Sequence, residues 1–280
     1  MKSVLRRLSQ AITESPAVAV LVTVVVAAAA AILTPPTSAK EAPMSKPTIL
    51  LVHGAFAESA SWNGVMKRLL AKGYPVVAVA NPLRSVKGDA SYLDSVVDSV
   101  NGPVILVGHS YGGNVISNAA TAKGKVKALV YAAGLAPEPG ESAASLGAKF
   151  PTGTLGPTLA PPVPLADGSK DLYIQQDKYP NQFAPDVPVA EAKLMAAAQR
   201  PITEAALNEP STTAAWKTIP SWFIYGSLDK NIPATLHAFM AKRAGAKKTV
   251  AIEGASHVVM ISHPDALVKL IDEAAAEAAN

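Results

Sequence analysis

Short apolar runs alternate with amphipathic segments along most of the chain after residue 45. Six runs are mainly apolar and four or five residues long: Thr48–Val52, Val76–Ala80, Val104–Val107, Ala128–Ala132, Trp222–Tyr225 and Thr249–Ile252. Such runs are typical of parallel strands that are covered on both faces. The segments between them predict helices at Ser61–Lys72, Ser91–Val100, Gly112–Ala122 and Ala234–Lys242, and a last helix from Pro264. The alternation predicts an α/β fold with a mostly parallel, doubly wound sheet.

The alternation stops between Pro137 and Pro220, where 13 of the 23 prolines lie. Proline cannot donate a hydrogen bond to a central ladder, so we expect no sheet there. The one helical pattern in this region is sparse and covers Val189–Gln199. We therefore expect residues of about 137–215 to form a cap over the carboxyl ends of the strands, where ligands bind in open α/β folds.

The first residues predict a secretory leader at positions 1–39. Lys2, Arg6 and Arg7 precede the uncharged run Ala17–Leu33, and small residues follow that run. This order is typical of a signal peptide. We therefore expect an exported protein, either periplasmic or secreted.

Two other interpretations of this leader stay open beside cleavage after Ala39 or Ala42. The uncharged run has 17 residues, slightly fewer than the roughly 20 that cross a bilayer, so it also fits an uncleaved N-terminal anchor. Translation from Met44 would instead leave a cytoplasmic protein without a leader. Contact with a membrane is expected only through this segment.

Composition fits a single domain at residues 45–280. Of the 280 residues, 49% are hydrophobic and 16% are charged, as in ordinary globular proteins. Residues 1–39 carry +2 of the net charge of +4, since they hold three basic residues and one glutamate. The rest therefore has no basic excess that would indicate nucleic-acid binding. The absence of cysteine excludes disulfides and thiolate metal sites.

The segment Gly108-His109-Ser110-Tyr111-Gly112 carries the strongest chemical signal. It follows a predicted strand and opens a predicted helix, which is the context of a nucleophile elbow. Such a turn strains the backbone of the serine, and side chains at positions 108 and 112 would collide with the adjoining strand and helix. We predict that Ser110 is a catalytic nucleophile, the alternative being a chance glycine-rich turn with a surface serine.

A serine nucleophile needs a base and a carboxylate that orients the base. Asp229 and His257 each follow a predicted strand, so both are expected at the carboxyl edge of the sheet together with Ser110. We predict that these three residues form a catalytic triad. Asp229 could instead be a turn or capping residue, and the other candidates are, for the acid, Glu253 and Asp265, and for the base, His263 and His237.

The oxyanion of the tetrahedral intermediate needs two donors. The N–H of Tyr111 is one, and the loop after the first strand supplies the other, for which we choose the N–H of Ala55, with Phe56 as the alternative. His53 in that loop is expected to be structural. Predicted substrate-binding residues are Phe56, Phe183 and Met195, although plain packing explains such apolar residues equally well.

These motifs resemble those of the α/β-hydrolase superfamily over positions 48 to 275. The closest similarity is to the branch that holds plant methylesterases and hydroxynitrile lyases, together with small bacterial esterases. It rests on four stretches: Leu50 to Phe56, Gly108 to Gly113, Tyr225 to Pro233 and Gly254 to His257. The resemblance implies the α/β-hydrolase fold, with a cap inserted after the sixth strand. It also implies the same triad, and an oxyanion hole formed by the amides of Ala55 and Tyr111.

The resemblance and its departures favour an esterase. Lyases of this branch typically carry Thr where this chain has Gly54, and Lys where it has Val258, so cyanohydrin cleavage is less favoured. We predict a serine carboxylesterase that acts on small or aromatic esters and needs no metal or organic cofactor. The alternatives are a perhydrolase or haloperoxidase-like acyl transferase, a hydroxynitrile lyase-like enzyme, and a non-catalytic ligand receptor. Substrate identity and oligomeric state stay open.

Overall fold

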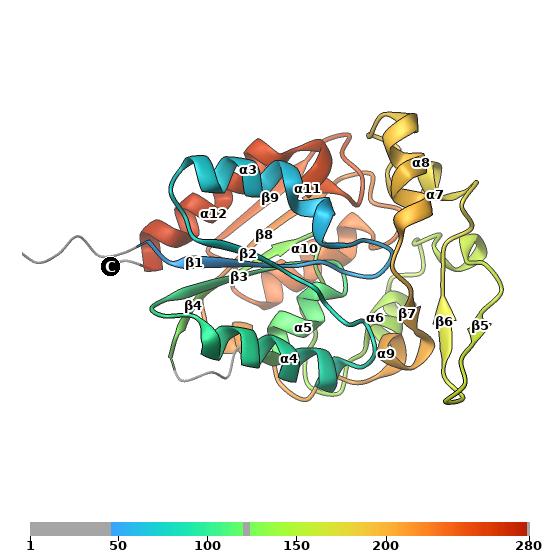
Figure 1. The fold of residues 1–280 in the computed structure, drawn as a ribbon, viewed down its shortest axis with the longest axis horizontal. Coiled ribbons are helices and arrows are strands. Elements are labelled where there is room, and N and C mark those ends of the chain that lie inside the picture. Colours follow the sequence, from blue (N-terminus) through green and yellow to red (C-terminus); the bar gives the residue numbers. More distant parts are fainter. Residues whose placement is uncertain (1–45, 120–123, 279–280) are drawn as a thin grey trace, which may run out of the picture. The chain divides into compact units, whose positions relative to one another are not determined.

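Six strands form the central sheet, and all neighbouring strands in it run parallel (Figure 1). Their order is β2 (Val76–Val79), β1 (Thr48–Val52), β3 (Val104–His109), β4 (Val126–Ala132), β8 (Ser221–Gly226) and β9 (Lys248–Ile252). The computed structural model describes residues 46–119 and 124–278. Strands β1 and β3 are buried along their whole length, whereas β2 and β9 at the edges are partly exposed. The predicted parallel sheet is confirmed.

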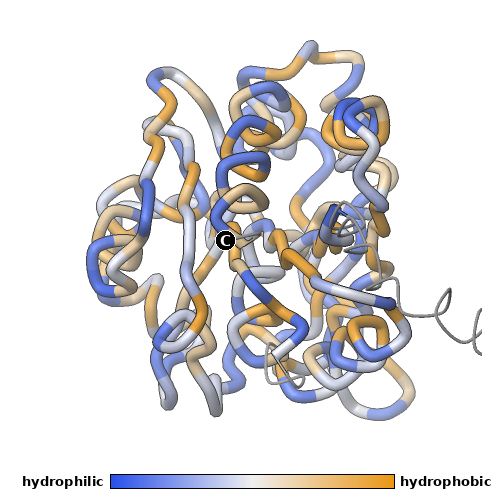
Figure 2. Tube along the Cα trace, turned by 90° about the vertical axis from the view of Figure 1, so that its left-hand side faces the viewer, coloured by the Kyte–Doolittle hydropathy of each residue, from blue (hydrophilic) through white to orange (hydrophobic). Residues whose placement is uncertain are grey.

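Helices cover both faces of this sheet. Helices α3 (Asn63–Ala71) and α12 (Pro264–Ala278) pack together on one face, and α4 (Val86–Ser99) and α5 (Gly112–Ala119) on the other (Figure 1). Two further helices, α10 (Ala234–Arg243) and α11 (Val259–Ser262), contact β8, and a short 3-10 turn, η1 (Ser59–Trp62), leads into α3. Hydrophobic and hydrophilic residues alternate along the outer helices, so each has one face for the core (Figure 2).

The helix predicted at Ser91–Val100 begins five residues earlier, at Val86. Ser85 caps it, because its hydroxyl accepts a 3.0 Å hydrogen bond from the N–H of Gly88. Strand β3 also runs two residues beyond the predicted end, to His109. The strand therefore leads directly into Ser110.

The segment between β4 and β8 forms the cap. It contains the following elements: α6 (Ala143–Lys149), η2 (Gly156–Thr158), β5 (Val163–Pro164), β6 (Lys170–Leu172), α7 (Tyr179–Phe183), α8 (Val189–Ala198), β7 (Ile202–Thr203), α9 (Glu204–Asn208) and η3 (Ala215–Lys217). It follows the fourth described strand along the chain, not a sixth one. The helix expected at Val189–Gln199 is present as α8.

The expectation that the cap contains no sheet was wrong. Strands β5, β6 and β7 form a small antiparallel sheet, which lies apart from the central one (Figure 1). Pro164 pairs with Lys170 on the edge strand β5, where a proline is tolerated because no second neighbour needs its missing N–H. The strands have only two or three residues each, too few for an alternating pattern to be visible.

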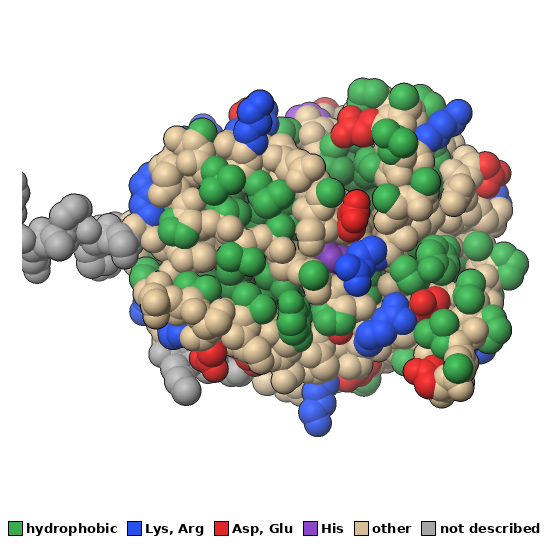
Figure 3. All heavy atoms as spheres, viewed as in Figure 1, with side chains coloured by type: hydrophobic (Ala, Val, Ile, Leu, Met, Phe, Trp, Pro, Cys, Tyr) green, Lys and Arg blue, Asp and Glu red, His purple; other side chains and the backbone are tan. Residues whose placement is uncertain are grey.

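The predicted leader at residues 1–39 lies outside the described residues. Within the described part of the chain, no helix is sufficiently long and apolar to span a bilayer. On the face drawn in Figure 3, Lys and Arg side chains are scattered among neutral ones and form no continuous patch. This distribution agrees with the low basic excess of the sequence.

Candidate active site

Ser110 occupies the sharp turn between β3 and α5. Its φ is 54°, a left-handed backbone conformation that is uncommon for a residue other than glycine. Three hydrogen bonds hold this turn: Ser110 N–H donates to Ala133 O (3.2 Å), and Ser110 O accepts from the N–H groups of Gly113 (2.9 Å) and Leu135 (3.0 Å). Strain that the surroundings hold in place in this way is characteristic of functional sites.

The glycines beside Ser110 are required by close backbone contacts. A Cβ atom at position 108 would lie 2.6 Å from Gly112 O, and one at position 112 would lie 2.3 Å from Val52 O. Both distances are far below van der Waals contact. Register explains the second contact, because Val52 at the end of β1 pairs with Gly108 of β3. The sheet therefore brings the loop after β1 against the serine turn.

Asp229 and His257 meet at the carboxyl ends of β8 and β9. Nδ1 of His257 lies 2.7 Å from Oδ2 of Asp229, and both side chains are buried. The other oxygen, Oδ1, accepts hydrogen bonds from the N–H groups of Asn231 (2.8 Å) and Ile232 (2.9 Å). Burial alone would raise the pKa of Asp229, but the neighbouring histidines hold it well below its usual value. Asp229 is therefore placed to orient His257 as an ionised acceptor.

His237 is a partner of Asp229 that the sequence did not identify. Its Nε2 lies 3.2 Å from Oδ2, and its ring stacks on Tyr225 with centroids 5.0 Å apart. Because an ionised carboxylate only accepts, the proton of this hydrogen bond belongs to Nε2. Burial lowers the pKa of His237, which favours the neutral ring. Its place on α10, eight residues after Asp229 and on the buried face, was the only available signal.

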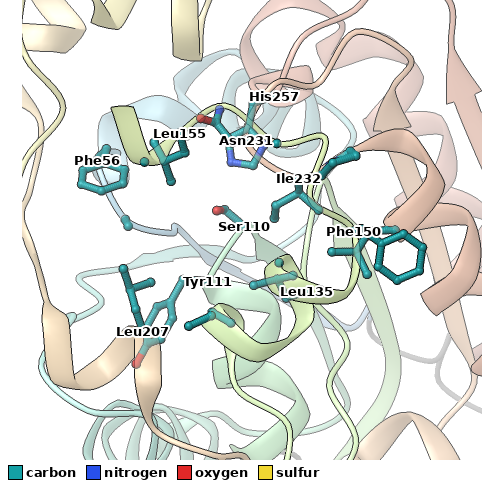
Figure 4. A pocket seen from close by; sticks show the side chains of 18 of the residues that line it. Phe56, Ser110, Tyr111, Leu135, Phe150, Leu155, Leu207, Asn231, Ile232 and His257 are labelled. Atoms are coloured by element: carbon teal, nitrogen blue, oxygen red, sulfur yellow. The ribbon is translucent and has the colours of Figure 1, made fainter. Parts of the chain in front are cut away.

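Ser110 and His257 line one cavity of about 370 Å³. Figure 4 shows the side chains of Ser110, Asn231 and His257 around the same open space. Most of the other lining residues are apolar: Ala55, Phe56, Leu135, Ala143, Ala144, Phe150, Leu155, Phe183, Leu207, Ile232, Pro233 and Leu236. None of the described lining residues is Lys, Arg, Asp or Glu.

The loop after β1 lies against the serine. A Cβ atom at Gly54 would lie 2.6 Å from Ser110 Cβ and 3.0 Å from Tyr111 N, so glycine alone fits here without a shift. Ala55 and Tyr111, the predicted oxyanion donors, both line the cavity. The alternative donor, the N–H of Phe56, is already bonded to Arg200 O at 2.9 Å. Of the two choices in this loop, the geometry favours Ala55.

Two histidines near the site have supporting positions. His53 is buried, its Nδ1 donates to Gly54 O at 2.9 Å, and burial lowers its pKa to about 4. This arrangement agrees with the structural role expected of it. His109 places Nε2 at 3.2 Å from the carbonyl oxygen of His257, and its ring lies 4.8 Å from the His257 ring. His109 therefore packs behind the predicted base.

The cap also contacts the His257 loop directly. Asp186, between α7 and α8, accepts a 3.0 Å hydrogen bond from Ser256 N–H and a second, short one from the Ser256 hydroxyl. Gln182 of α7 likewise donates to Asn231 Oδ1 at 3.0 Å, two residues after Asp229. The cap thus braces both loops that carry the predicted base and acid.

The predicted substrate-binding residues are only partly brought together. Phe56 and Phe183 line the cavity with Ser110, and their rings meet edge to face at 6.3 Å. Met195 does not line it. The side of α8 that carries Met195 borders a second cavity, because the other side of that helix packs through Ala192 and Ala196 into the core. The remaining alternatives lie elsewhere: Asp265 pairs with Arg68, and His263 Nδ1 contacts Ser262 Oγ.

No group of three or more His, Asp or Glu side chains is arranged as a metal site within residues 46–119 and 124–278. The polar side chains around the cavity are those of Ser110, Tyr111, Asn231 and His257. Tyr111 directs its hydroxyl away, to Asp89 Oδ2 at 2.9 Å. The reactive groups that remain are a hydroxyl, an amide and an imidazole.

Comparison with known proteins places this fold among known hydrolases. A family model described as "Alpha/beta hydrolase family" matches residues 49–270. The alpha/beta hydrolase nvfD of Aspergillus novofumigatus is 29% identical over 259 residues, which cover 84% of this chain and 99% of that protein. The structure of polyneuridine aldehyde esterase superposes with a TM-score of 0.71 at 20% identity, over 81% of this chain and 99% of that one. A pyrethroid hydrolase from Sphingobium faniae gives a TM-score of 0.65 at 21% identity, over 82% and 97%.

Proposed function

Since the chain belongs to the alpha/beta hydrolase family, we propose that it is a serine carboxylesterase that acts on small or aromatic neutral esters. One observation carries this proposal. Ser110, held at a φ of 54°, shares a mainly apolar cavity with His257, whose Nδ1 is bonded to the buried Asp229 at 2.7 Å. This is the constellation of nucleophile, base and orienting carboxylate that ester hydrolysis requires.

In the first half of the reaction, Ser110 is acylated. Because Nδ1 of His257 faces Asp229, Nε2 is the nitrogen that takes the proton from Oγ while Oγ attacks the ester carbonyl carbon. The negative charge then moves to the carbonyl oxygen, where the N–H groups of Ala55 and Tyr111 stabilise it. Cleavage of the ester C–O bond releases the alcohol, which takes the proton back from His257. Ser110 is left as an acyl ester.

In the second half, water replaces the alcohol. His257 takes a proton from the water as its oxygen attacks the acyl carbon, and the same two N–H groups hold the second oxyanion. The bond to Oγ breaks, His257 returns the proton to Ser110, and the carboxylic acid leaves. No step needs an oxidant, a reductant or a metal ion.

The lining of the cavity supports neutral substrates. A charged group would lose its hydration there without meeting an opposite charge, because the described lining residues include none. The names of polyneuridine aldehyde esterase and the pyrethroid hydrolase supply a second, weaker support, since one names an esterase and the other a hydrolase. Cyanohydrin cleavage is not proposed, because a threonine at Gly54 would collide with Ser110 and because Val258 is buried.

A panel of esters tests this function. The wild type is expected to hydrolyse neutral esters such as p-nitrophenyl acetate and methyl benzoate, and to discriminate against a matched half-ester that carries a free carboxylate. Ser110→Ala and His257→Ala should each lose most of the turnover, with a residual rate of roughly 1000- to 10,000-fold over water. Equal rates on neutral and carboxylate-bearing esters would contradict the assignment of the cavity, and wild-type rates in either variant would contradict the mechanism.

A further inference from the structure

A second cavity of about 410 Å³ lies next to the catalytic one. Its lining comes from the segment around η1, from the start of α3 and from the cap: Phe56, Ala57, Glu58, Ala60, Ser61, Asn63, Gly64, Tyr179, Glu191, Leu194, Met195, Ala198, Gln199 and Ile261. Phe56 is the one described residue that lines both cavities. The two spaces are therefore separated at Phe56.

The backbone of Phe56 is held from both sides. Its N–H donates to Arg200 O at 2.9 Å, and its carbonyl oxygen accepts from the hydroxyl of Tyr179 at 2.8 Å. Its φ of 60° is a further restraint, since few conformations satisfy both bonds. The ring is only 2% exposed and packs edge to face on Phe183. Figure 4 shows this ring at the border of the catalytic cavity. The ring is therefore a fixed wall.

We propose that Phe56 determines substrate length by closing the catalytic cavity against this second cavity, an inference that rests on the proposed esterase function. In the wild type, an ester chain that extends toward Phe56 stops at its ring. Removal of the ring joins the two cavities and roughly doubles the space available to such a chain. Longer linear esters then become substrates, because each additional methylene group is buried instead of excluded.

The second cavity also selects the chemistry of the chain end. Glu58 and Glu191 are part of its lining, together with apolar residues such as Leu194 and Met195. A chain that reaches it through the opening is therefore expected to end in an apolar or a cationic group. A terminal carboxylate would face two like charges.

Chain-length profiles of Phe56→Ala and Phe56→Leu test the proposal. The substrates are p-nitrophenyl esters from acetate to laurate and alkyl acetates from ethyl to dodecyl, which vary the acyl and the alcohol side separately. In Phe56→Ala, the ratio of kcat/KM for the longest to the shortest ester should rise roughly 10-fold or more on one of the two sides, as expected for a few newly buried methylene groups. Phe56→Leu keeps most of the bulk and should retain the wild-type profile.

A second substitution shows whether the gain comes from this cavity. In the double variant Phe56→Ala, Met195→Trp, the larger side chain fills the second cavity and should remove the gain. Met195→Trp alone should leave the wild-type profile unchanged, since Met195 does not line the catalytic cavity. If Phe56→Ala does not fold, as judged by circular dichroism, Phe56→Val provides the same comparison with a smaller truncation.

The outcomes separate this inference from the proposed function. An active truncation variant with the wild-type chain-length profile would overturn the role of Phe56 alone, as would a gain that persists in the double variant. Absence of hydrolysis of every ester by the wild type would overturn both the esterase function and this inference.

Discussion

Nε2 of His237 lies 3.2 Å from Oδ2 of Asp229, and this is the oxygen that also accepts the 2.7 Å hydrogen bond from His257. One buried carboxylate oxygen therefore has two imidazole donors, while Oδ1 has two backbone donors. All four bonds favour the ionised form of Asp229 in a site from which water is excluded. His237 is thus a positioning residue for the predicted triad, although it does not line the catalytic cavity.

Replacement of His237 should lower kcat without a matching change in KM. His237→Leu removes a donor from a buried charged acceptor, a loss that typically corresponds to roughly 10-fold or more in rate. His237→Gln can still donate from its side-chain amide and should stay within about threefold of the wild type. Steady-state kinetics on a neutral ester, with thermal unfolding to verify the fold, make the comparison. Equal kcat values for the Leu variant and the wild type would exclude the positioning role.

Gly54→Ala should abolish most activity. The added Cβ would lie 2.6 Å from Ser110 Cβ and 2.7 Å from His109 O, so the loop that carries the Ala55 amide has to move away from the serine. Displacement of one oxyanion donor typically costs about 100- to 1000-fold in kcat. Gly64→Ala is the matched control, because a Cβ at this helical position makes only ordinary contacts, the nearest at 3.5 Å. An active Gly54→Ala enzyme would show that this loop supplies no donor.

Asp186→Asn should reduce kcat through the loop that carries His257. The carboxylate of Asp186 accepts from both the N–H and the hydroxyl of Ser256, and an amide can reproduce only one of these bonds well. A loss of roughly 3- to 10-fold is expected, in line with one charge-assisted hydrogen bond. Asp177→Asn, at an exposed position of the same cap, serves as the control. If both variants have the same kcat, the cap does not brace the base.

Glu141 should make the fold sensitive to acid. Burial opposes its ionisation, but hydrogen bonds from Arg243, from the N–H of Glu138 and from Lys149 outweigh it and lower the pKa from 4.5 to about 2. Because the unfolded state binds the proton first, this contribution to stability is present above about pH 5 and is lost as the pH falls toward 2.

Unfolding midpoints measured across that pH range test this expectation. The slope of stability against pH should be smaller in Glu141→Gln than in the wild type between pH 5 and pH 2. The control Glu277→Gln removes a carboxylate from an exposed ion pair with Lys247 and should leave the slope unchanged. Identical slopes for Glu141→Gln and the wild type would refute the assignment.

The sequence predicted the central sheet well because its strands are buried on both faces. Strands such as β1 and β3 must then be apolar throughout, which is a pattern that single positions cannot imitate. Register is the consequence that matters for the site, since pairing of Val52 with Gly108 sets Gly54 against Ser110. Residues that follow strands were therefore predicted together correctly in space.

The cap and the partners of the site could not be predicted in the same way. Strands of two residues, such as β5 and β7, show no period, and tertiary contacts determine them instead. Met195 was expected near the serine because the fold of the cap, which turns this face of α8 toward a different cavity, has no local signal. His237 was regarded as an ordinary helix residue for the same reason, since only the packing of α10 on β8 brings it to Asp229.

Covalent labelling of Ser110 tests the central claim most directly. The wild-type protein is treated with a fluorophosphonate, digested and mapped by mass spectrometry, with Ser110→Ala and the heat-unfolded wild type as controls. Because only an activated hydroxyl attacks phosphorus at a useful rate, the adduct is expected on Ser110 of the folded wild type and in neither control. Folded protein that carries no adduct on Ser110, or carries it on another serine, would contradict the assignment of the nucleophile.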